Sequence, residues 1–108
     1  WVASTSHLPH LLATALALCI PPEAAPLAGP GFRSTSRLAS GSADMKIDIF
    51  ATNTPSVLAA LESFRQQLDA LEDALRRSDF DSLHGQLAQG AARRQGLISE
   101  SKRINPCN

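Results

Sequence analysis

Two arginines four residues apart, Arg33 and Arg37, follow a turn that Gly29, Pro30 and Gly31 can make. If the chain enters a helix after this turn, the two side chains share one helix face. A guanidinium is permanently charged, and its planar fork of donors fits a carboxylate. The spacing therefore indicates either an anion site or two solvated surface arginines, since most charged side chains on helices face water.

Two histidines near the start of the chain, His7 and His10, lie three residues apart and so share a helix face. Such a pair can bind a metal ion, but no third ligand stands at a plausible spacing, because His84 is remote and Cys19 lies on an apolar face. We therefore expect no metal site. The rings are either satisfied by backbone and neighbouring groups or donate hydrogen bonds to a bound hydroxyl or carboxylate.

The composition excludes several classes of function. The chain has 108 residues, which is enough for one domain with a modest core. Ten basic and ten acidic residues give no net charge, which argues against a nucleic-acid partner. The cysteines Cys19 and Cys107 form neither a metal spacing nor a disulfide framework, which favours a reducing compartment. No GxGxxG motif with a βαβ unit is present, so dinucleotide binding by the usual device is not expected, and no catalytic triad of convincing order is found.

The elements that must position these residues are predicted to be helices. Apolar residues at helical spacing predict a first helix over residues 4–20, which either is capped by Ser6 or runs through and is kinked by Pro9. Residues 21–31 are a break rich in proline, alanine and glycine. A short helix is expected from Arg33 to about Ser40, with Gly41 in the left-handed conformation after it. The next helix, from residue 43 or 44 to 52, has Met45, Ile49 and Phe50 on its apolar side.

The first of these segments also resembles a lipoprotein signal, because an apolar run from Leu11 to Ile20 contains a cysteine. The run follows histidines rather than lysine or arginine, and Leu18 stands where a cleavage site requires a small side chain. This run of ten residues is also too short to span a bilayer. We therefore expect no membrane segment.

The clearest periodicity predicts a long helix from Thr54, as the capping residue before Pro55, to about Arg77. Its apolar residues alternate steps of four and three and form a seam: Val57, Leu61, Phe64, Leu68, Leu71 and Leu75. The seam can pack within its own chain or against a second subunit, and both are possible at once. Two acid-first ion pairs, Glu72 with Arg76 and Asp73 with Arg77, are expected on the outer faces.

A second helix with a weaker stripe is predicted to fold back antiparallel on the first. Ser78 and Asp79 end the first helix and cap the second, whose stripe is formed by Phe80, Leu83, Leu87, Ala91 and Leu97. Residues 99–108 are expected to form a frayed polar tail. The predicted fold is all-α, a helical bundle of about five helices with a long C-terminal helical hairpin.

Three segments resemble, in order and at similar spacing, the prephenate/arogenate dehydrogenase family. Ser6-His7-Leu8-Pro9-His10 is similar to its Ser-His-Leu-Pro-His segment. The stretch from Gly31 to Gly41 resembles its Gly-Phe-Arg/Lys-Asp-Thr-Thr-Arg-Ile-Ala segment, and the stretch from Met45 to Asn53 resembles Met-Trp-Arg-Asp-Ile-Phe-x-x-Asn. The resemblance covers residues 3–98 and implies that residues 1–98 are the C-terminal helical dimerisation and substrate-binding domain.

The resemblance implies an oxidoreductase that, as a full-length enzyme, oxidatively decarboxylates prephenate or arogenate in cytoplasmic tyrosine biosynthesis. NAD or NADP and the catalytic base would be held by an N-terminal nucleotide-binding domain upstream, so this chain alone is predicted to be inactive. The implied partners are the substrate, tyrosine as an inhibitor, and a second subunit in a homodimer. The family also favours the kinked first helix, because there this segment continues a long helix from the preceding domain.

The resemblance also assigns roles to the residues named first. Arg37 matches the arginine that grips the substrate carboxylate, Arg33 a basic position of the same loop, and His7 and His10 a substrate-binding pair. The chain departs from the family at Ser34, where Asp is usual, and at Lys46, where many members have Trp. Lys46 is therefore expected either to change the substrate preference or to be exposed to solvent.

Two other classes of function fit the same residues. A non-enzymatic helical module that associates through the leucine seam with itself or a partner needs no ligand, and Arg37 would then be dispensable. An exported helical lipoprotein is the third reading, and an uncleaved Cys19 would exclude it. The sequence does not decide between prephenate and arogenate. It does not decide between NAD and NADP either, because the contacts to the nicotinamide cofactor would lie upstream.

Overall fold

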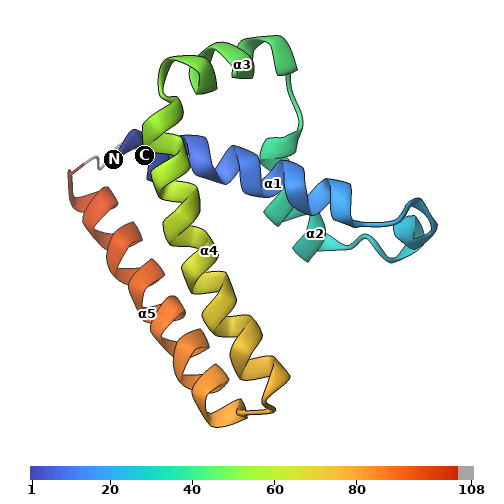
Figure 1. Cartoon of the computed structure of the whole chain (residues 1–108), viewed down its shortest axis with the longest axis vertical. Helices are drawn as coiled ribbons and strands as arrows, with labels where there is room; N and C mark the ends of the chain where they lie inside the picture. The colour runs from blue at the N-terminus through green and yellow to red at the C-terminus, as the bar shows by residue number, and fades with distance from the viewer. Residues whose placement is uncertain (105–108) are drawn as a thin grey trace. The chain divides into compact units, whose positions relative to one another are not determined.

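A computed structural model of the chain describes residues 1–104, and every element within them is helical. The α-helices of the described residues (Figure 1) are α1 (Leu8–Cys19), α2 (Pro30–Ser36), α3 (Ala43–Thr52), α4 (Thr54–Arg76) and α5 (Phe80–Ile104). A π-helical turn, η1 (Ala3–His7), and two 3₁₀ segments, η2 (Pro22–Leu27) and η3 (Arg37–Ala39), complete the order. The predicted all-α class is confirmed. The chain forms two compact units, Trp1–Phe64 and Arg65–Asn108, with the boundary inside α4.

The first helical stretch is continuous from η1 into α1. His7 and Leu8 both have right-handed helical dihedrals, and no side chain caps the start of α1, so Ser6 does not begin the helix. Pro9 has no N–H to donate to the preceding turn. The wider π-helical turn lies directly before it, and such turns accompany helix distortions. Of the two alternatives, the helix that runs through Pro9 is therefore the one observed.

The core of the first unit joins the start of α1 to the start of α4. Its buried residues are Ala3, Leu8, Val57 and Ala60, and partly buried apolar side chains pack against them: Leu11, Leu12, Phe50, Leu61 and Phe64. The first three seam residues, Val57, Leu61 and Phe64, thus pack within the chain. This burial fixes the N-terminal end of α1, which carries both histidines.

The turn before Arg33 is shorter than predicted, because α2 begins at Pro30 rather than at Arg33. Gly29 is extended and precedes a proline at the first helical position, which is a favourable start for a helix. The helix tightens into η3 at Arg37, and Gly41 then has a φ of 105°, as predicted. Arg33 and Arg37 therefore lie on two successive helical segments.

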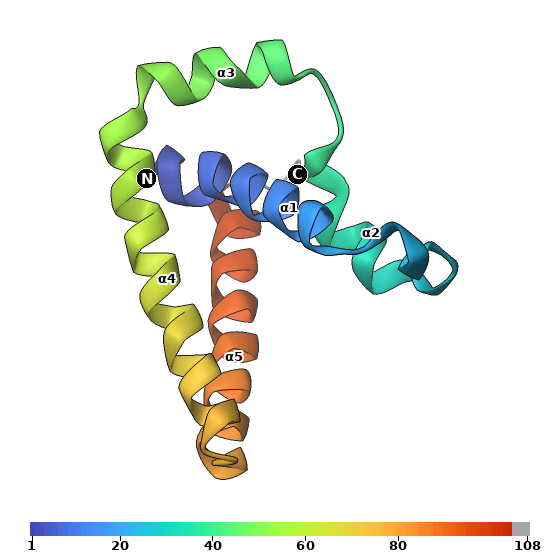
Figure 2. The same ribbon diagram turned by 45° about the vertical axis from the view of Figure 1, so that its right-hand side comes forward.

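The apolar side predicted for α3 is not packed within the described chain. The Ser42 hydroxyl accepts the Met45 N–H at 3.4 Å and caps the helix, as its predicted start requires. Met45 is nevertheless 74% exposed and Ile49 is also exposed, so only Phe50 contributes to the core. Figure 2 shows the α3 ribbon lying apart from α1. Periodicity predicted an apolar side for this helix, and the described chain covers only its Phe50 end.

The start of α4 differs from the prediction in its capping. The Thr54 hydroxyl donates to the carbonyl of Phe50 at 2.8 Å, so it satisfies the end of α3 and does not accept a hydrogen bond from α4. The N–H of Val57 instead donates to the carbonyl of Asn53 at 3.0 Å. Asn53 is therefore the residue at which the chain turns from α3 into α4.

In the second unit, the last turns of α4 and the first turns of α5 lie side by side and antiparallel (Figures 1 and 2), which confirms the predicted hairpin. Ala74 is only 3% exposed, and Leu71 and Leu83 are half-buried. Leu68 and Leu75 are 50% and 56% exposed, so the seam is only partly used within the chain. Most of the predicted α5 stripe is likewise exposed: Phe80, Leu87, Ala91 and Leu97.

The charged side chains of the second unit follow the predicted pattern. Glu72 pairs with Arg76 at 3.5 Å and Asp73 with Arg77 at 3.1 Å, as expected. The predicted tail from Ser99 does not start there, because α5 continues to Ile104, and residues 105–108 lie outside the described part of the chain. A bidentate contact from Arg103 to Glu100 in the last turn lowers the pKa of the Glu100 carboxyl.

The turn between α4 and α5 contains a residue in a costly conformation. Ser78 has a φ of 53°, in the left-handed region that favours glycine. The N–H of Asp79 donates to Ala74 at 2.9 Å and closes the end of α4, while the Asp79 carboxylate accepts the Ser82 N–H at 3.0 Å and caps α5.

Replacing Ser78 by glycine is expected to raise the free energy of unfolding by up to about 1 kcal/mol, because the Cβ penalty of the left-handed conformation is removed. Urea denaturation followed by circular dichroism measures it. Ser63→Gly, in the interior of α4, is the control and should destabilise the chain. A destabilised Ser78→Gly variant would contradict the conformation described here.

Within residues 1–104, no helix combines the length and the apolarity that crossing a membrane requires.

Candidate functional site

The two histidines meet different segments of the first unit. The helix α1 packs on α2 and on η3. This brings Nδ1 of His10 to 3.1 Å from the carbonyl oxygen of Leu38, the residue after Arg37. Segments 28 residues apart are thereby joined by one hydrogen bond. The structure thus brings one of the predicted histidines to the backbone of the segment that carries Arg37.

Lys46 holds the same segment from α3. Its Nζ donates to the carbonyl of Leu38 and to the carbonyl of Ser40, both at 2.7 Å. These carbonyls lie at the end of η3, where helical segments leave acceptors without intrahelical partners. The expectation of a solvent-exposed Lys46 is therefore wrong: the side chain is half-buried, and its ammonium caps the end of η3.

Replacing Lys46 by methionine should lower the free energy of unfolding by about 1 to 2 kcal/mol, because two hydrogen bonds from a charged donor are lost while the aliphatic stem is kept. Chemical denaturation measures the change. Lys102→Met, at an exposed position of α5, is the matched control and should have little effect. Equal effects of the two substitutions would contradict a capping role for Lys46.

His7 lies near the end of α3 rather than near η3. Its Nδ1 is 3.4 Å from the Asn53 side-chain nitrogen, and its ring meets Phe50 edge-on, with centroids 6.1 Å apart. Both histidines are half-buried, so neither residue is closed off from solvent. The pair therefore shares one helix but has separate partners.

The two arginines are exposed, and neither guanidinium makes an ion pair or a hydrogen bond within residues 1–104. The backbone of Arg37 is well held, because its carbonyl accepts the hydroxyl of Ser40 at 2.8 Å. All three ion pairs of the described residues lie in the second unit. Arg33 and Arg37 lie on successive segments, the second of which Lys46 contacts, and none of the three pairs with a carboxylate in the described chain, which suits an anionic ligand.

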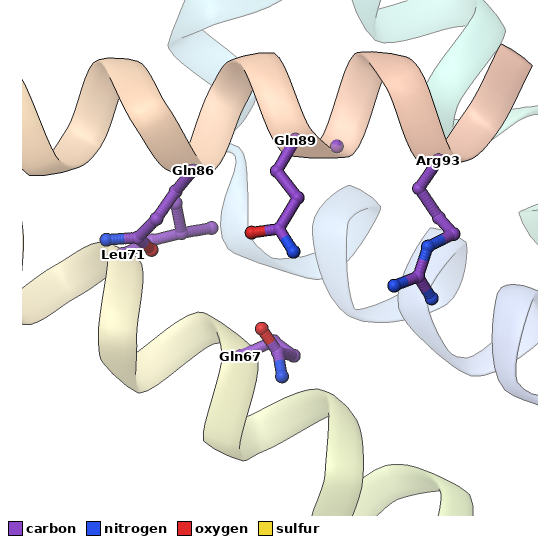
Figure 3. A pocket seen from close by; sticks show the side chains of 6 residues that line it. Gln67, Leu71, Gln86, Gln89 and Arg93 are labelled. Atoms are coloured by element: carbon purple, nitrogen blue, oxygen red, sulfur yellow. The ribbon is translucent and has the colours of Figure 1, made fainter.

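No group of three metal-ligating side chains gathers anywhere in the described range, and Cys19 is an exposed free thiol. A hollow of about 430 Å³ lies in the second unit between α4 and α5 (Figure 3). Its lining contains none of the predicted site residues: Gln67, Leu71, Gln86, Gln89, Gly90 and Arg93. The chemistry predicted from the sequence is therefore confined to the first unit.

A comparison with known families decides the affiliation of the chain. The sequence model of the prephenate dehydrogenase dimerization domain matches residues 1–89. The chain belongs to the prephenate dehydrogenase family. The predicted family is thereby confirmed, and the match covers both histidines, both arginines and the whole of α4.

A solved structure supports the same affiliation. The chain is similar to Synechocystis arogenate dehydrogenase, with a TM-score of 0.82 and 30% sequence identity. The similarity covers 89% of this chain but 37% of that protein, so the chain corresponds to one part of such a dehydrogenase. The all-α fold described above is thus that of a dimerization domain found in the prephenate dehydrogenase family.

Sequence analysis of this prephenate dehydrogenase domain missed three contacts of the site. It did not single out Asn53 or Phe50 as partners of His7, and it did not predict that Lys46 would hold η3. Asn53 was visible only as a matched position in the segment from Met45 to Asn53, and Phe50 was visible there and on the predicted apolar side of the helix. The role of the Leu38 carbonyl gives no signal in a sequence, because every residue has a backbone carbonyl whatever its side chain.

Proposed function

We propose that residues 1–98 are the C-terminal dimerisation and substrate-binding domain of an NAD(P)-dependent dehydrogenase acting on prephenate or arogenate. The observation that carries this is Arg37: an exposed guanidinium without a carboxylate partner in the described chain, on a segment whose backbone is held by His10 and Lys46. A cation so placed can bind the carboxylate of a ligand without first breaking an internal ion pair.

In the proposed reaction, a cyclohexadienyl substrate gives hydride to NAD(P)⁺ and loses its ring carboxylate as CO₂, and the ring becomes aromatic. The nucleotide and the catalytic base belong to an N-terminal domain of the full-length enzyme. The part played by this chain is positioning, which is a large share of catalysis when two reactants must be aligned. Arg37 binds a carboxylate, Arg33 supports the same loop, and His7 and His10 contact polar groups of the substrate.

The second part of the proposal is a homodimer that buries the exposed seam. Leu68 and Leu75 on α4, and Leu87 and Leu97 on α5, leave large apolar areas in water. A monomer rarely exposes so many large apolar side chains on one helical hairpin. The matching family model is that of a dimerization domain. We further propose a cytoplasmic enzyme of tyrosine biosynthesis, with tyrosine as an inhibitor.

Calorimetric titration of the chain with prephenate, arogenate and tyrosine tests the binding function. Heat of binding to at least one of them is expected. An interaction module without a ligand, which the exposed leucines also fit, predicts no heat with any of the three. If no heat is measured and the chain associates stably with itself, the chain is an interaction module and not a substrate-binding domain.

The isolated chain is expected to produce no NAD(P)H from either substrate, because neither a nucleotide-binding motif nor a catalytic base is part of it. Absorbance at the reduced-nicotinamide band, with each substrate and each nucleotide, measures this. An unrelated intact dehydrogenase in the same buffer with its own substrate serves as the positive control. Steady formation of NAD(P)H by the purified chain would overturn the division of roles.

A further inference from the structure

The contacts of the two histidines determine which ring nitrogen carries the hydrogen. A backbone carbonyl oxygen can only accept, so Nδ1 of His10, at 3.1 Å from the Leu38 oxygen, must be the protonated nitrogen of the neutral ring. The Asn53 carboxamide nitrogen, which can only donate, lies 3.4 Å from Nδ1 of His7, and with the amide in this orientation Nδ1 is the bare nitrogen. The two rings therefore have opposite requirements.

We propose that His7 and His10 are held in opposite tautomers, so that the site offers a ligand one hydrogen-bond donor and one acceptor. His7 keeps its hydrogen on Nε2 and donates from it. His10 keeps its hydrogen on Nδ1, so its Nε2 accepts. The Lys46 ammonium also donates a hydrogen bond to the Leu38 carbonyl oxygen. This second donor does not change the tautomer of His10, because the oxygen still only accepts.

The arrangement specifies the chemistry of the ligand groups that each ring takes. A group at Nε2 of neutral His10 must donate, as a hydroxyl does, whereas a group at Nε2 of His7 must accept, as a carboxylate does. This deepens the proposed function and rests on it for the identity of the ligand. The tautomers themselves follow from contacts within the chain and do not need a ligand.

The tautomers can be measured in the ¹⁵N-labelled full chain by long-range ¹H–¹⁵N correlation at about pH 9, where free imidazole is neutral. His84 is an internal reference, since its exposed ring makes no hydrogen bond among residues 1–104 and should show the Nε2–H form that water favours. His7→Gln and His10→Gln assign the signals. The expected result is Nδ1–H for His10 and Nε2–H for His7.

A variant separates the two rings. Asn53→Asp replaces the donating amide by a carboxylate that only accepts, so His7 should change to Nδ1–H while His10 and His84 keep their signals. The proposal is overturned if His10 shows the same Nε2–H form as His84, or if Asn53→Asp leaves His7 unchanged while His10 retains its signals. Because no ligand is added, failure here is distinct from failure of the calorimetric titration.

Discussion

Arg37→Ala is expected to weaken binding of prephenate or arogenate by roughly 100-fold. A guanidinium–carboxylate contact contains two charge-assisted hydrogen bonds, and a hydrogen bond to a charged group contributes about 1.5 to 3 kcal/mol. The guanidinium makes no ion pair in the described chain, so its removal should cost little stability. Calorimetric titration gives the dissociation constant, and circular dichroism tests whether the fold is retained.

Arg33→Ala is the matched control, because it removes the same exposed side chain four residues earlier. It should weaken binding less, as Arg33 supports the loop in the proposal. Arg37→Lys should fall between, since an ammonium keeps the charge but cannot form the bidentate contact. Equal losses for Arg33→Ala and Arg37→Ala would mean that the region attracts anions only by its overall charge.

The double substitution of Leu68 and Leu75 by glutamate is expected to convert a dimer to a monomer, raising the dimer dissociation constant by at least about 100-fold. Each leucine is about half exposed within the chain, so the substitution should be tolerated in the monomer. Burial of each leucine in an interface contributes about 1.5 to 3 kcal/mol at most, and a buried unpaired carboxylate costs more. Sedimentation velocity over a range of concentrations measures the change.

Gln66→Glu adds one negative charge, half that of the double variant, at an exposed position of α4 outside the seam and should leave the association unchanged. Retained helical circular dichroism in the double variant excludes simple unfolding. If the variant remains a dimer, the exposed seam on α4 is not the subunit contact, and the leucines of α5 become the next surface to substitute.

Periodicity and local signals predicted most of the helical framework. Gly41 has the left-handed φ that its place after a short helix required, and the Glu72–Arg76 and Asp73–Arg77 pairs follow from spacing alone. These features depend on residues within one turn of one another, which a sequence displays directly. The apolar seam of α4 was visible for the same reason.

Features that depend on contacts between elements were not predictable in the same way. The seam pattern places Val57 and Leu68 on one face, but it does not tell that Val57 is buried against α1 while Leu68 remains half exposed. Lys46 was expected to alter the substrate preference or to be exposed to solvent. Its ammonium instead donates hydrogen bonds to the carbonyls of Leu38 and Ser40, eight and six residues earlier in the chain. Thr54 was placed correctly at a helix start, but its hydroxyl serves the preceding helix.

The carbonyl oxygen of Leu38 accepts one hydrogen bond from His10 and one from Lys46, and thus engages both of its lone pairs. The acceptor belongs to the main chain, so evolutionary change of the residue type at position 38 cannot delete it. Selection acts on these two hydrogen bonds most directly through the two donors. Substitution of Leu38 should therefore keep the carbonyl that anchors the segment of Arg37. Substitution of His10 or Lys46 removes one of the two hydrogen bonds to that carbonyl.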